Sequence, residues 1–412
     1  MASTYRNFLT SVPWLILCLE AVCMVLFFFL GFDISPLIPY PAFQDVNHMM
    51  VFGFGFFLTF LKRYGFSSTG FNLLIIAVGV QCSVLVEALL HFLIGGSSWF
   101  DDSLKRITQA SVSMTSVVIS TGVILGRANP LQLILMTVVE IIFFHISRCI
   151  NTLYLEVPYS NSLMHVHLFG AYFGLAVSSQ FPEPSPRAEK SSSTPKSDLF
   201  SMLGTLFLWV FWPSFNSVLF SNYRQTAIYN TYFALAVSAV TAFVLSVLTT
   251  KDGKFRMTDI HSAALAGGVA VGYAMGSIQH PWIAMILGLL ASVIAILGSS
   301  CLQRCLNPAL KIHDATGVHF TFGLPAVLGG LAHLLLVGIE GWINISRYIN
   351  SSYLGSLVMT HLGAICQTIS VALVTGFITG LILNLRPFKT TPVSKYFDDQ
   401  FYWEFPHLAV GF

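Results

Sequence analysis

Long apolar stretches, each close to the length of a membrane-spanning helix, follow one another along nearly the whole chain. A helix needs about 20 mostly apolar residues to cross the hydrocarbon core of a bilayer. The pattern therefore predicts an all-α polytopic membrane protein with about twelve transmembrane helices. We place the spans at residues 12–31, 47–61, 72–95, 107–126, 130–150, 161–180, 199–221, 227–249, 259–278, 281–301, 318–339 and 355–384.

The amino-acid composition supports the prediction of a membrane protein. Of the 412 residues, 55% are hydrophobic and only 9% are charged. Soluble domains carry roughly 25% charged residues, so a soluble protein with so few charges could not cover its surface. The formal net charge of +2 is too small to indicate nucleic-acid binding.

The distribution of positive charge predicts the orientation. Cytoplasmic loops are enriched in Lys and Arg. An even number of spans puts both termini on one side, and fifteen of the 20 Lys and Arg residues fall on that side. We therefore expect cytoplasmic termini, a transmembrane domain over 1–385 with a cytoplasmic loop near 181–198, and a cytoplasmic tail over 386–412. Sequons at Asn344 and Asn350 fall on the outer side, where they are possible glycosylation sites, although such triplets also arise by chance.

A histidine within an apolar run is the first functional signal. His167 lies in the apolar run 163–175. Burying an ionisable group at membrane depth costs free energy unless the group is paired or has a function. The leading hypothesis is therefore that His167 belongs to a polar pathway through the membrane. His165 precedes it by two residues, and side chains two apart on a helix point roughly 200° apart. Only one of the two histidines can therefore face a pathway.

Other ionisable residues in the spans have simpler explanations. Glu87 and His91 are four residues apart and share a helix face, so we expect a satisfied pair between packed helices. We expect His333 and His361 to be single structural histidines. Glu140 fits either a cation vestibule or burial against a neighbouring helix.

Small residues and one proline suggest how the helices pack. Gly170 and Gly174, like Gly268 and Gly272, have the spacing that lets helix backbones approach closely in lipid. Pro325 lies within the span 318–339 and predicts a break or kink at membrane depth.

Four internal motifs and the tail carry a family resemblance. The motifs are HLFGAYFGL at 167–175, GTLFLWVFWPSFNS at 204–217, AALAGGVAVG at 263–272 and KIHDATGVH at 311–319. Together they resemble the Amt/Rh family of ammonium transporters, on its animal Rh branch. The tail, YFDDQFYWEFPHLAVGF at 396–412, is similar to that of the blood-group Rh polypeptides rather than the Rh-associated glycoproteins.

The resemblance implies a fold and a set of pore residues. It implies an Amt/Rh channel fold with pseudo-twofold inverted halves, trimeric assembly and one narrow pore per protomer. In transporting members two histidines face each other in the pore, two phenylalanines gate its outer mouth, and an aspartate lies eight positions before the first histidine. The corresponding positions here are His167 and Phe322, Phe215 and Val112, and Tyr159.

This chain has only part of the pore residues of transporting members, and two functions are compatible with that. Ammonium must shed its water or its proton to pass a narrow apolar pore. Phe322 offers no hydrogen bond in place of the second imidazole, and its bulk would fill the pore, whereas His167 could instead bond Thr321 or Asn216. The first function is conduction of ammonia, ammonium or another small neutral gas through a modified pore.

The second function is that of a weakly conducting or non-conducting subunit in the plasma membrane. The resemblance implies a homo- or heterotrimer with a Rh-associated glycoprotein, in an erythroid complex linked to the ankyrin-based skeleton. The segment with Asp398, Asp399, Trp403 and Glu404 is a candidate docking site for ankyrin, or else a solvated chain end. An enzyme is a third class, but no carboxylate or cysteine cluster completes a site at His313-Asp314 or His165-x-His167, so we expect no catalysis, metal or cofactor.

Overall fold

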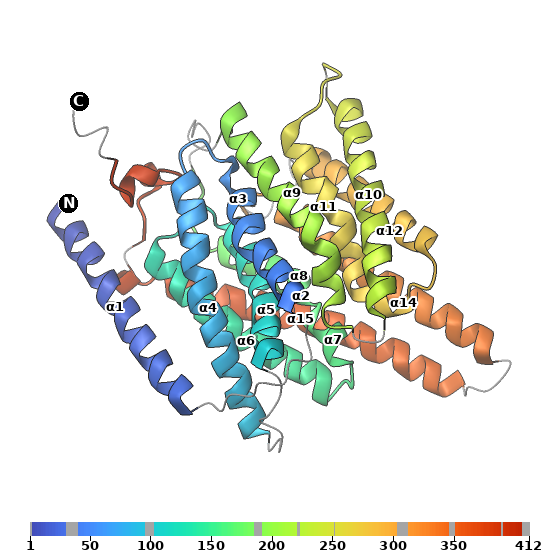
Figure 1. The fold of residues 1–412 in the computed structure, drawn as a ribbon. Helices are drawn as coiled ribbons and strands as arrows, with labels where there is room; N and C mark the ends of the chain where they lie inside the picture. Colours follow the sequence, from blue (N-terminus) through green and yellow to red (C-terminus); the bar gives the residue numbers. More distant parts are fainter. Residues whose placement is uncertain are drawn as a thin grey trace.

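Helices make up all the regular structure of the residues described in the computed structural model, which are 2–29, 40–94, 103–184, 192–220, 223–250, 252–302, 312–345, 351–388 and 390–405 (Figure 1). The α-helices are α1 (Ala2–Phe29), α2 (Tyr40–His48), α3 (Gly55–Phe57), α4 (Gly65–Leu93), α5 (Ser103–Val123), α6 (Pro130–Leu153), α7 (Tyr159–Leu163), α8 (Val166–Ser178), α9 (Pro195–Ser217), α10 (Arg224–Thr249), α11 (Met257–Ala274), α12 (Pro281–Leu297), α14 (Leu324–Ile345) and α15 (Ser351–Leu383). Three π-helical turns in the described residues, η1 (Met49–Phe54), η5 (Gly298–Leu302) and η6 (His319–Gly323), lie between or at the ends of the α-helices.

Each of the twelve predicted spans falls on a helical segment. Among the described residues, eight helices are long and apolar enough to cross a membrane: α1, α4, α6, α9, α10, α12 with the turn after it, α14 with η6, and α15. The remaining four predicted spans fall on the broken segment from α2 through η1 and α3, on α5, on α7 with α8, and on α11. The helical segments are therefore consistent with twelve spans.

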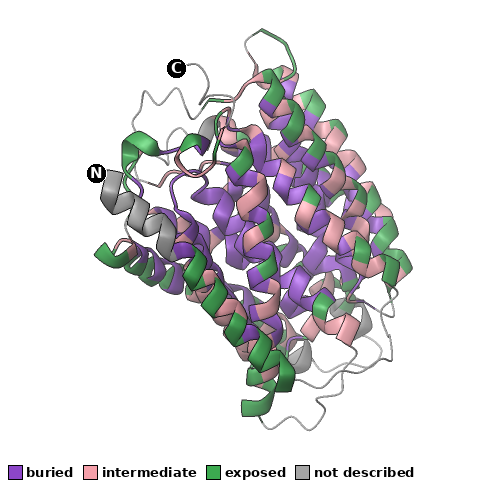
Figure 2. Ribbon diagram, turned by 60° about the vertical axis from the view of Figure 1, so that its left-hand side comes forward, coloured by how far each residue is buried: buried purple, intermediate pink, exposed green. Residues whose placement is uncertain are grey.

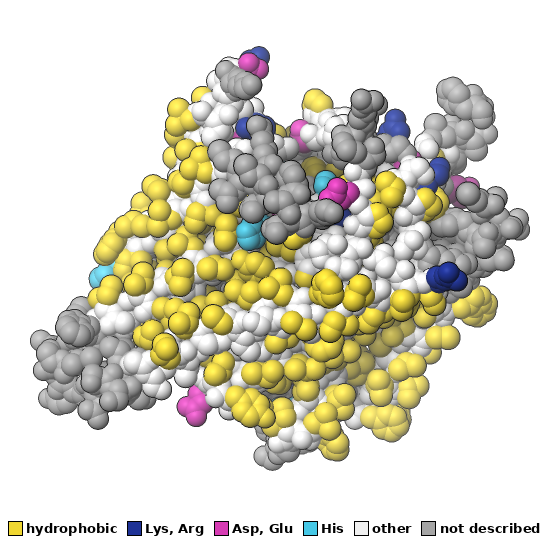
Figure 3. All heavy atoms as spheres, turned by 180° about the vertical axis from the view of Figure 1, so that it is seen from behind, with side chains coloured by type: hydrophobic (Ala, Val, Ile, Leu, Met, Phe, Trp, Pro, Cys, Tyr) yellow, Lys and Arg dark blue, Asp and Glu magenta, His cyan; other side chains and the backbone are white. Residues whose placement is uncertain are grey.

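Three helices outside these eight candidate spans, α5, α8 and α11, are the most deeply buried. In α5 every residue from Thr108 to Val123 is buried, and α8 and α11 are almost as fully covered. Figure 2 shows the buried residues gathered in the middle of the bundle. A helix surrounded by protein need not be apolar on its outer face, provided that its polar groups find partners. Ser113, for example, donates to the carbonyl of Gln109 at 2.9 Å. The outer helices carry the lipid-compatible surface, seen as a broad apolar band in Figure 3.

Glycines allow α8 to lie directly against α5. A Cβ on Gly170 would lie 2.3 Å from the carbonyl oxygen of Ser116, and one on Gly174 would lie 2.7 Å from the Cα of Ser120. This close backbone approach confirms the expectation for the first pair. The second pair differs, because Gly268 and Gly272 make room for the side chains of α9 residues rather than for a neighbouring backbone.

The interruption predicted at Pro325 takes the form of a π-helical turn. Pro325 is the second residue of α14, directly after η6. Proline has no N–H to bond the carbonyl four residues earlier, and π-helical turns inside helices often occur at functional sites. The turn carries Phe322, which lies buried in the centre of the bundle.

The tail packs on the start of α4 and is not simply a solvated chain end. The carboxylate of Asp399 accepts hydrogen bonds from the backbone N–H groups of Phe66 (2.8 Å) and Ser67 (2.9 Å). The indole N–H of Trp403 donates to the Ser67 hydroxyl at 2.9 Å, and its ring lies where a Cβ on Gly70 would be. Burial raises the pKa of the Asp399 carboxyl, and hydrogen bonds from Ser67 and Phe66 oppose the shift.

A second contact joins the tail to the α5–α6 loop. The backbone N–H of Phe397 donates to the carbonyl of Gly126 at 2.9 Å. Gly126 has φ +78°, and a Cβ there would lie 2.3 Å from the Phe397 ring. Glycine is favoured at such a position because it has no Cβ. The start of α1 and the described part of the tail lie at the same end of the bundle (Figure 1).

Candidate functional site

The buried ring of His167 is surrounded by three aromatic side chains. His167 lies in the first turn of α8, and only 1% of it is exposed. Its ring stacks on Trp212 (centroids 5.8 Å apart, planes 15° apart) and on Phe322 (6.3 Å, 6°), and it meets Phe215 edge to face (5.7 Å, 73°). The structure therefore brings together three of the five predicted pore residues: His167, Phe215 and Phe322.

The polar atoms of the His167 ring determine what this site can bind. The buried Nε2 of the ring has no hydrogen-bond partner among the described residues. A neutral imidazole has one donor nitrogen and one acceptor nitrogen, so Nε2 can accept a hydrogen bond from a bound molecule in the tautomer that carries the proton on Nδ1. The expected bond from His167 to Thr321 or Asn216 is absent from the described residues. The Asn216 amide donates instead to Thr231 (3.2 Å) and to the carbonyl of Gly268 (2.9 Å).

Trp212 adds an unpaired donor on a ring that is stacked against His167. Its side chain is fully buried, and its Nε1 has no partner among the described residues. Gly268 makes room for the indole, because a Cβ there would lie 2.8 Å from Nε1. Buried polar groups are almost always hydrogen-bonded, so each exception needs an explanation. The sequence analysis did not single out Trp212, although this residue lies in the motif at 204–217.

Phe322 closes one side of the site. Its ring also packs against Phe54 (6.1 Å) and Phe57 (6.2 Å), and only 1% of the residue is exposed. At the position facing His167 there is therefore an apolar ring with no donor or acceptor. Val112, on α5, is fully buried in the same core, and its role as a gate remains a prediction.

Tyr159 belongs to a separate ion-pair network. Its hydroxyl donates to Glu87 at 2.7 Å, and Arg148 lies 3.0 Å from the same carboxylate. Arg148 also donates to the Tyr159 hydroxyl and stacks over its ring, 4.5 Å from the centroid. The hydrogen-bond and ion-pair partners described for Glu87 are thus Arg148 and Tyr159. The sequence had predicted a pair with His91 instead. This network ties together α4, α6 and α7.

A group of histidines that does not include His167 lies around Tyr273. His165 stacks on the Tyr273 ring (4.7 Å), and the Tyr273 hydroxyl is hydrogen-bonded to His361 Nδ1 at 2.7 Å. The rings of His333 and His361 lie 4.4 Å apart. The expectation of two single histidines was therefore wrong. No spacing rule could have revealed this group, because its members come from α8, α11, α14 and α15 or directly flank them.

Glu140 is fully buried and accepts from Ser120 of α5, which favours the packing explanation over a vestibule. Asn344 falls in the last turn of α14, and Asn350 lies outside the described residues. In the described ranges no group of three or more His, Cys, Asp or Glu side chains is placed to hold a metal ion.

Comparison with known proteins identifies the family. A sequence profile of the Ammonium Transporter Family matches residues 35–396. The chain is 42% identical to an RH-like protein of Macaca mulatta and 39% identical to the blood group Rh(CE) polypeptide of Homo sapiens, in both cases over the full length of both chains.

A solved structure agrees with the sequence relatives. Nitrosomonas europaea Rh50, whose description names the Rhesus protein family of channels, superposes with a TM-score of 0.76 at 30% identity, over 90% of this chain and 93% of Rh50. The sensor Amt protein, at 20% identity and a TM-score of 0.66, shares the fold. These matches support the expected Amt/Rh channel fold, and the chain belongs to the ammonium transporter family, on its Rh branch.

Proposed function

We propose that this chain forms a modified Rh-type pore that passes neutral ammonia slowly, in the plasma membrane and with both termini in the cytoplasm. The observation that carries the proposal is the pair of unpaired buried groups, the acceptor His167 Nε2 and the donor Trp212 Nε1, next to stacked rings. A molecule that both donates and accepts hydrogen bonds would satisfy both groups.

Ammonia fits this pair better than ammonium does. Ammonia has N–H groups for His167 Nε2 and a lone pair for Trp212, whereas ammonium has no lone pair. An isolated ion in an apolar site also costs on the order of tens of kcal/mol by Born solvation, so it would lose its proton before entry. Phe322 supplies no second hydrogen bond beyond His167, and we therefore expect a low rate.

Stopped-flow measurement of ammonia entry into proteoliposomes tests this function. Vesicles that contain the chain should alkalinise faster than empty vesicles after an ammonia gradient is applied. His167→Ala should bring the rate close to that of empty vesicles. Equal rates for the wild type and empty vesicles would contradict conduction.

We propose as the second candidate a non-conducting subunit of a homo- or heterotrimer with a Rh-associated glycoprotein in an erythroid complex. The observation that favours it is the Phe322 ring, which is stacked parallel to His167 where a second imidazole would be needed. Co-purification of the two proteins, combined with vesicle rates no faster than background, would select this candidate. A link to ankyrin would have to use groups other than Asp399 and Trp403, because both are bound within the chain.

A further inference from the structure

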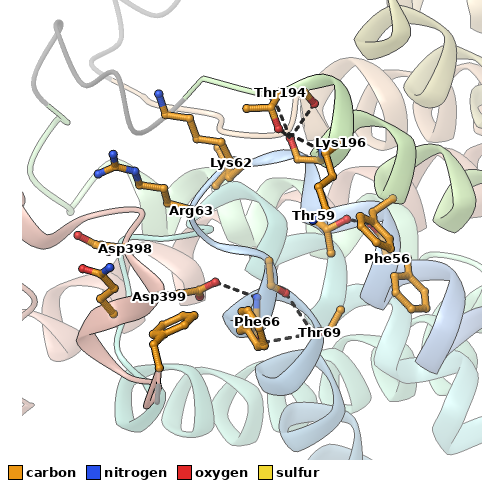
Figure 4. A pocket seen from close by; sticks show the side chains of 16 residues that line it. Phe56, Thr59, Lys62, Arg63, Phe66, Thr69, Thr194, Lys196, Asp398 and Asp399 are labelled. Carbon is orange, nitrogen blue, oxygen red and sulfur yellow. Dashed lines mark hydrogen bonds between the residues drawn. The ribbon is translucent and has the colours of Figure 1, made fainter. Parts of the chain in front are cut away.

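A cavity of about 710 Å³ lies between the tail, the start of α4 and the start of α9 (Figure 4). Internal bonds hold its walls together. The backbone N–H of Lys62 donates to the carbonyl of Ser192 at 3.2 Å, and the Ser197 hydroxyl donates to the carbonyl of Phe60 at 2.7 Å. The cavity is therefore part of the packed structure.

The described residues that line the cavity are positively charged on balance. Lys62, Arg63 and Lys196 line it together with Asp398 and Asp399, which leaves a formal charge of +1. The Asp399 carboxylate already accepts from two backbone N–H groups at the start of α4. Figure 4 shows Lys62, Arg63 and Lys196 around one side of the cavity and Phe66 and Asp399 on the other.

An apolar wall adjoins these charges. Phe56 and Phe200 stack with centroids 6.3 Å apart, and both line the cavity. Phe200 is 44% exposed and Phe66 is 58% exposed, on outer helices that are long and apolar enough to span a membrane. A ligand with one anionic end and one apolar end would satisfy both parts of the cavity.

We propose that this cavity binds an anionic phospholipid of the leaflet on the side of the tail. The headgroup phosphate would lie among Lys62, Arg63 and Lys196, and an acyl chain would run along Phe56 and Phe200. A lipid with a single net negative charge, such as phosphatidylserine, matches the formal charge of the lining. The apolar wall favours a lipid over a soluble phosphate, and this proposal does not depend on whether the pore conducts.

Native mass spectrometry of the full, delipidated chain tests the proposal. Dioleoyl phosphatidylserine should bind at least tenfold more tightly than dioleoyl phosphatidylcholine. The double variant Arg63→Ala/Lys196→Ala should weaken phosphatidylserine binding roughly ten- to thirtyfold, because each basic residue contributes roughly fivefold. Phe200→Ala should weaken binding of the lipid while leaving binding of water-soluble glycerophosphoserine unchanged.

The control is Lys254→Ala/Lys395→Ala, which removes two exposed positive charges outside the cavity lining. It should bind phosphatidylserine as the wild type does. Three results would overturn the proposal: equal binding of the two lipids, equal loss in the control and the cavity variant, or competition by glycerophosphoserine at the same concentration as the lipid. The first would show that charge does not select the lipid, the second would indicate general surface attraction, and the third would indicate a soluble anion.

Discussion

At the scale of single residues, the site depends on which polar atoms find partners at membrane depth. The Nε2 atoms of His165 and His167 both lack a partner among the described residues, but Nδ1 of His165 accepts from Asn151 at 3.2 Å and is hydrogen-bonded to Thr368 at 2.9 Å. Two histidines separated by one residue therefore have different surroundings. The difference arises because side chains two apart on a helical backbone point roughly 200° apart, so that His165 stacks on Tyr273 and His167 on Trp212 and Phe322.

Replacing Phe322 tests whether the missing imidazole limits conduction. Phe322→His places a second ring nitrogen opposite His167, in a site where the present rings are parallel. A net hydrogen bond of about 1 kcal/mol would raise the ammonia rate roughly fivefold. Proteoliposome alkalinisation measures this rate, and the double variant His167→Ala/Phe322→His is the control, which should show no gain. An unchanged rate in Phe322→His would indicate that another position, such as Val112 or Tyr159, is limiting.

The Glu87–Arg148–Tyr159 network should contribute to stability. Glu87→Gln leaves the buried guanidinium of Arg148 without its carboxylate, and removing one partner of a buried pair costs about 3 kcal/mol or more. We expect a lower melting temperature in detergent. Tyr159→Phe removes one hydroxyl and should cost only about 1 kcal/mol. Equal melting temperatures for Glu87→Gln and the wild type would show that Arg148 finds other partners.

At the scale of helices, close approach of α5 and α8 positions the site. Ser116 and Ser120 on α5 contact Gly170 and Gly174, which follow His167 by one and two helical turns. The first turn of α8 therefore has little freedom to shift. The π-helical turn η6, directly before α14, carries Phe322 and positions it beside His167.

Gly170→Ala should disturb this contact. The added methyl would lie 2.3 Å from a backbone oxygen, which a side-chain rotation cannot relieve, and the expected cost is about 1–3 kcal/mol. Thermal melting in detergent measures it. Gly363→Ala in α15 is the control, because its nearest heavy atom lies 3.9 Å away and alanine favours a helix. If both variants melt alike, the approach of α8 to α5 is looser than described.

At the scale of the whole molecule, the tail joins the start of α4 to the α5–α6 loop. Asp399 caps α4 from more than three hundred residues away in the sequence, and Phe397 bonds Gly126. In the α5–α6 loop itself, Arg127 donates to Ser178 and to the carbonyl of His313. Burial lowers the pKa of the Arg127 guanidinium to about 10. This end of the bundle is therefore assembled from segments distant in sequence.

Asp399→Ala should release the tail. Loss of a cap costs about 1 kcal/mol, and we expect faster cleavage of the tail by a protease in detergent. Glu404→Ala is the matched control, because it removes an exposed acid five residues away. Equal cleavage rates for the two variants would show that Trp403 and the aromatic contacts hold the tail without the cap.

The apolar segments could be predicted because lipid imposes a length and a composition on each helix that faces it. The twelve segments, the close approach at Gly170 and the interruption at Pro325 all follow from local sequence. The motif around His167 also indicated the family.

Other features depended on the tertiary structure, because they join residues that no sequence period relates. The grouping of His165, Tyr273, His333 and His361, the pairing of Glu87 with Arg148, and the unpaired nitrogen of Trp212 are of this kind. A side chain's sequence neighbours fix its helix and its face, whereas its hydrogen-bond partner is chosen by whichever other helix packs there. The sequence by itself therefore determined the membrane helices and the family, and only the packing of those helices decided which buried polar atoms were left without a partner.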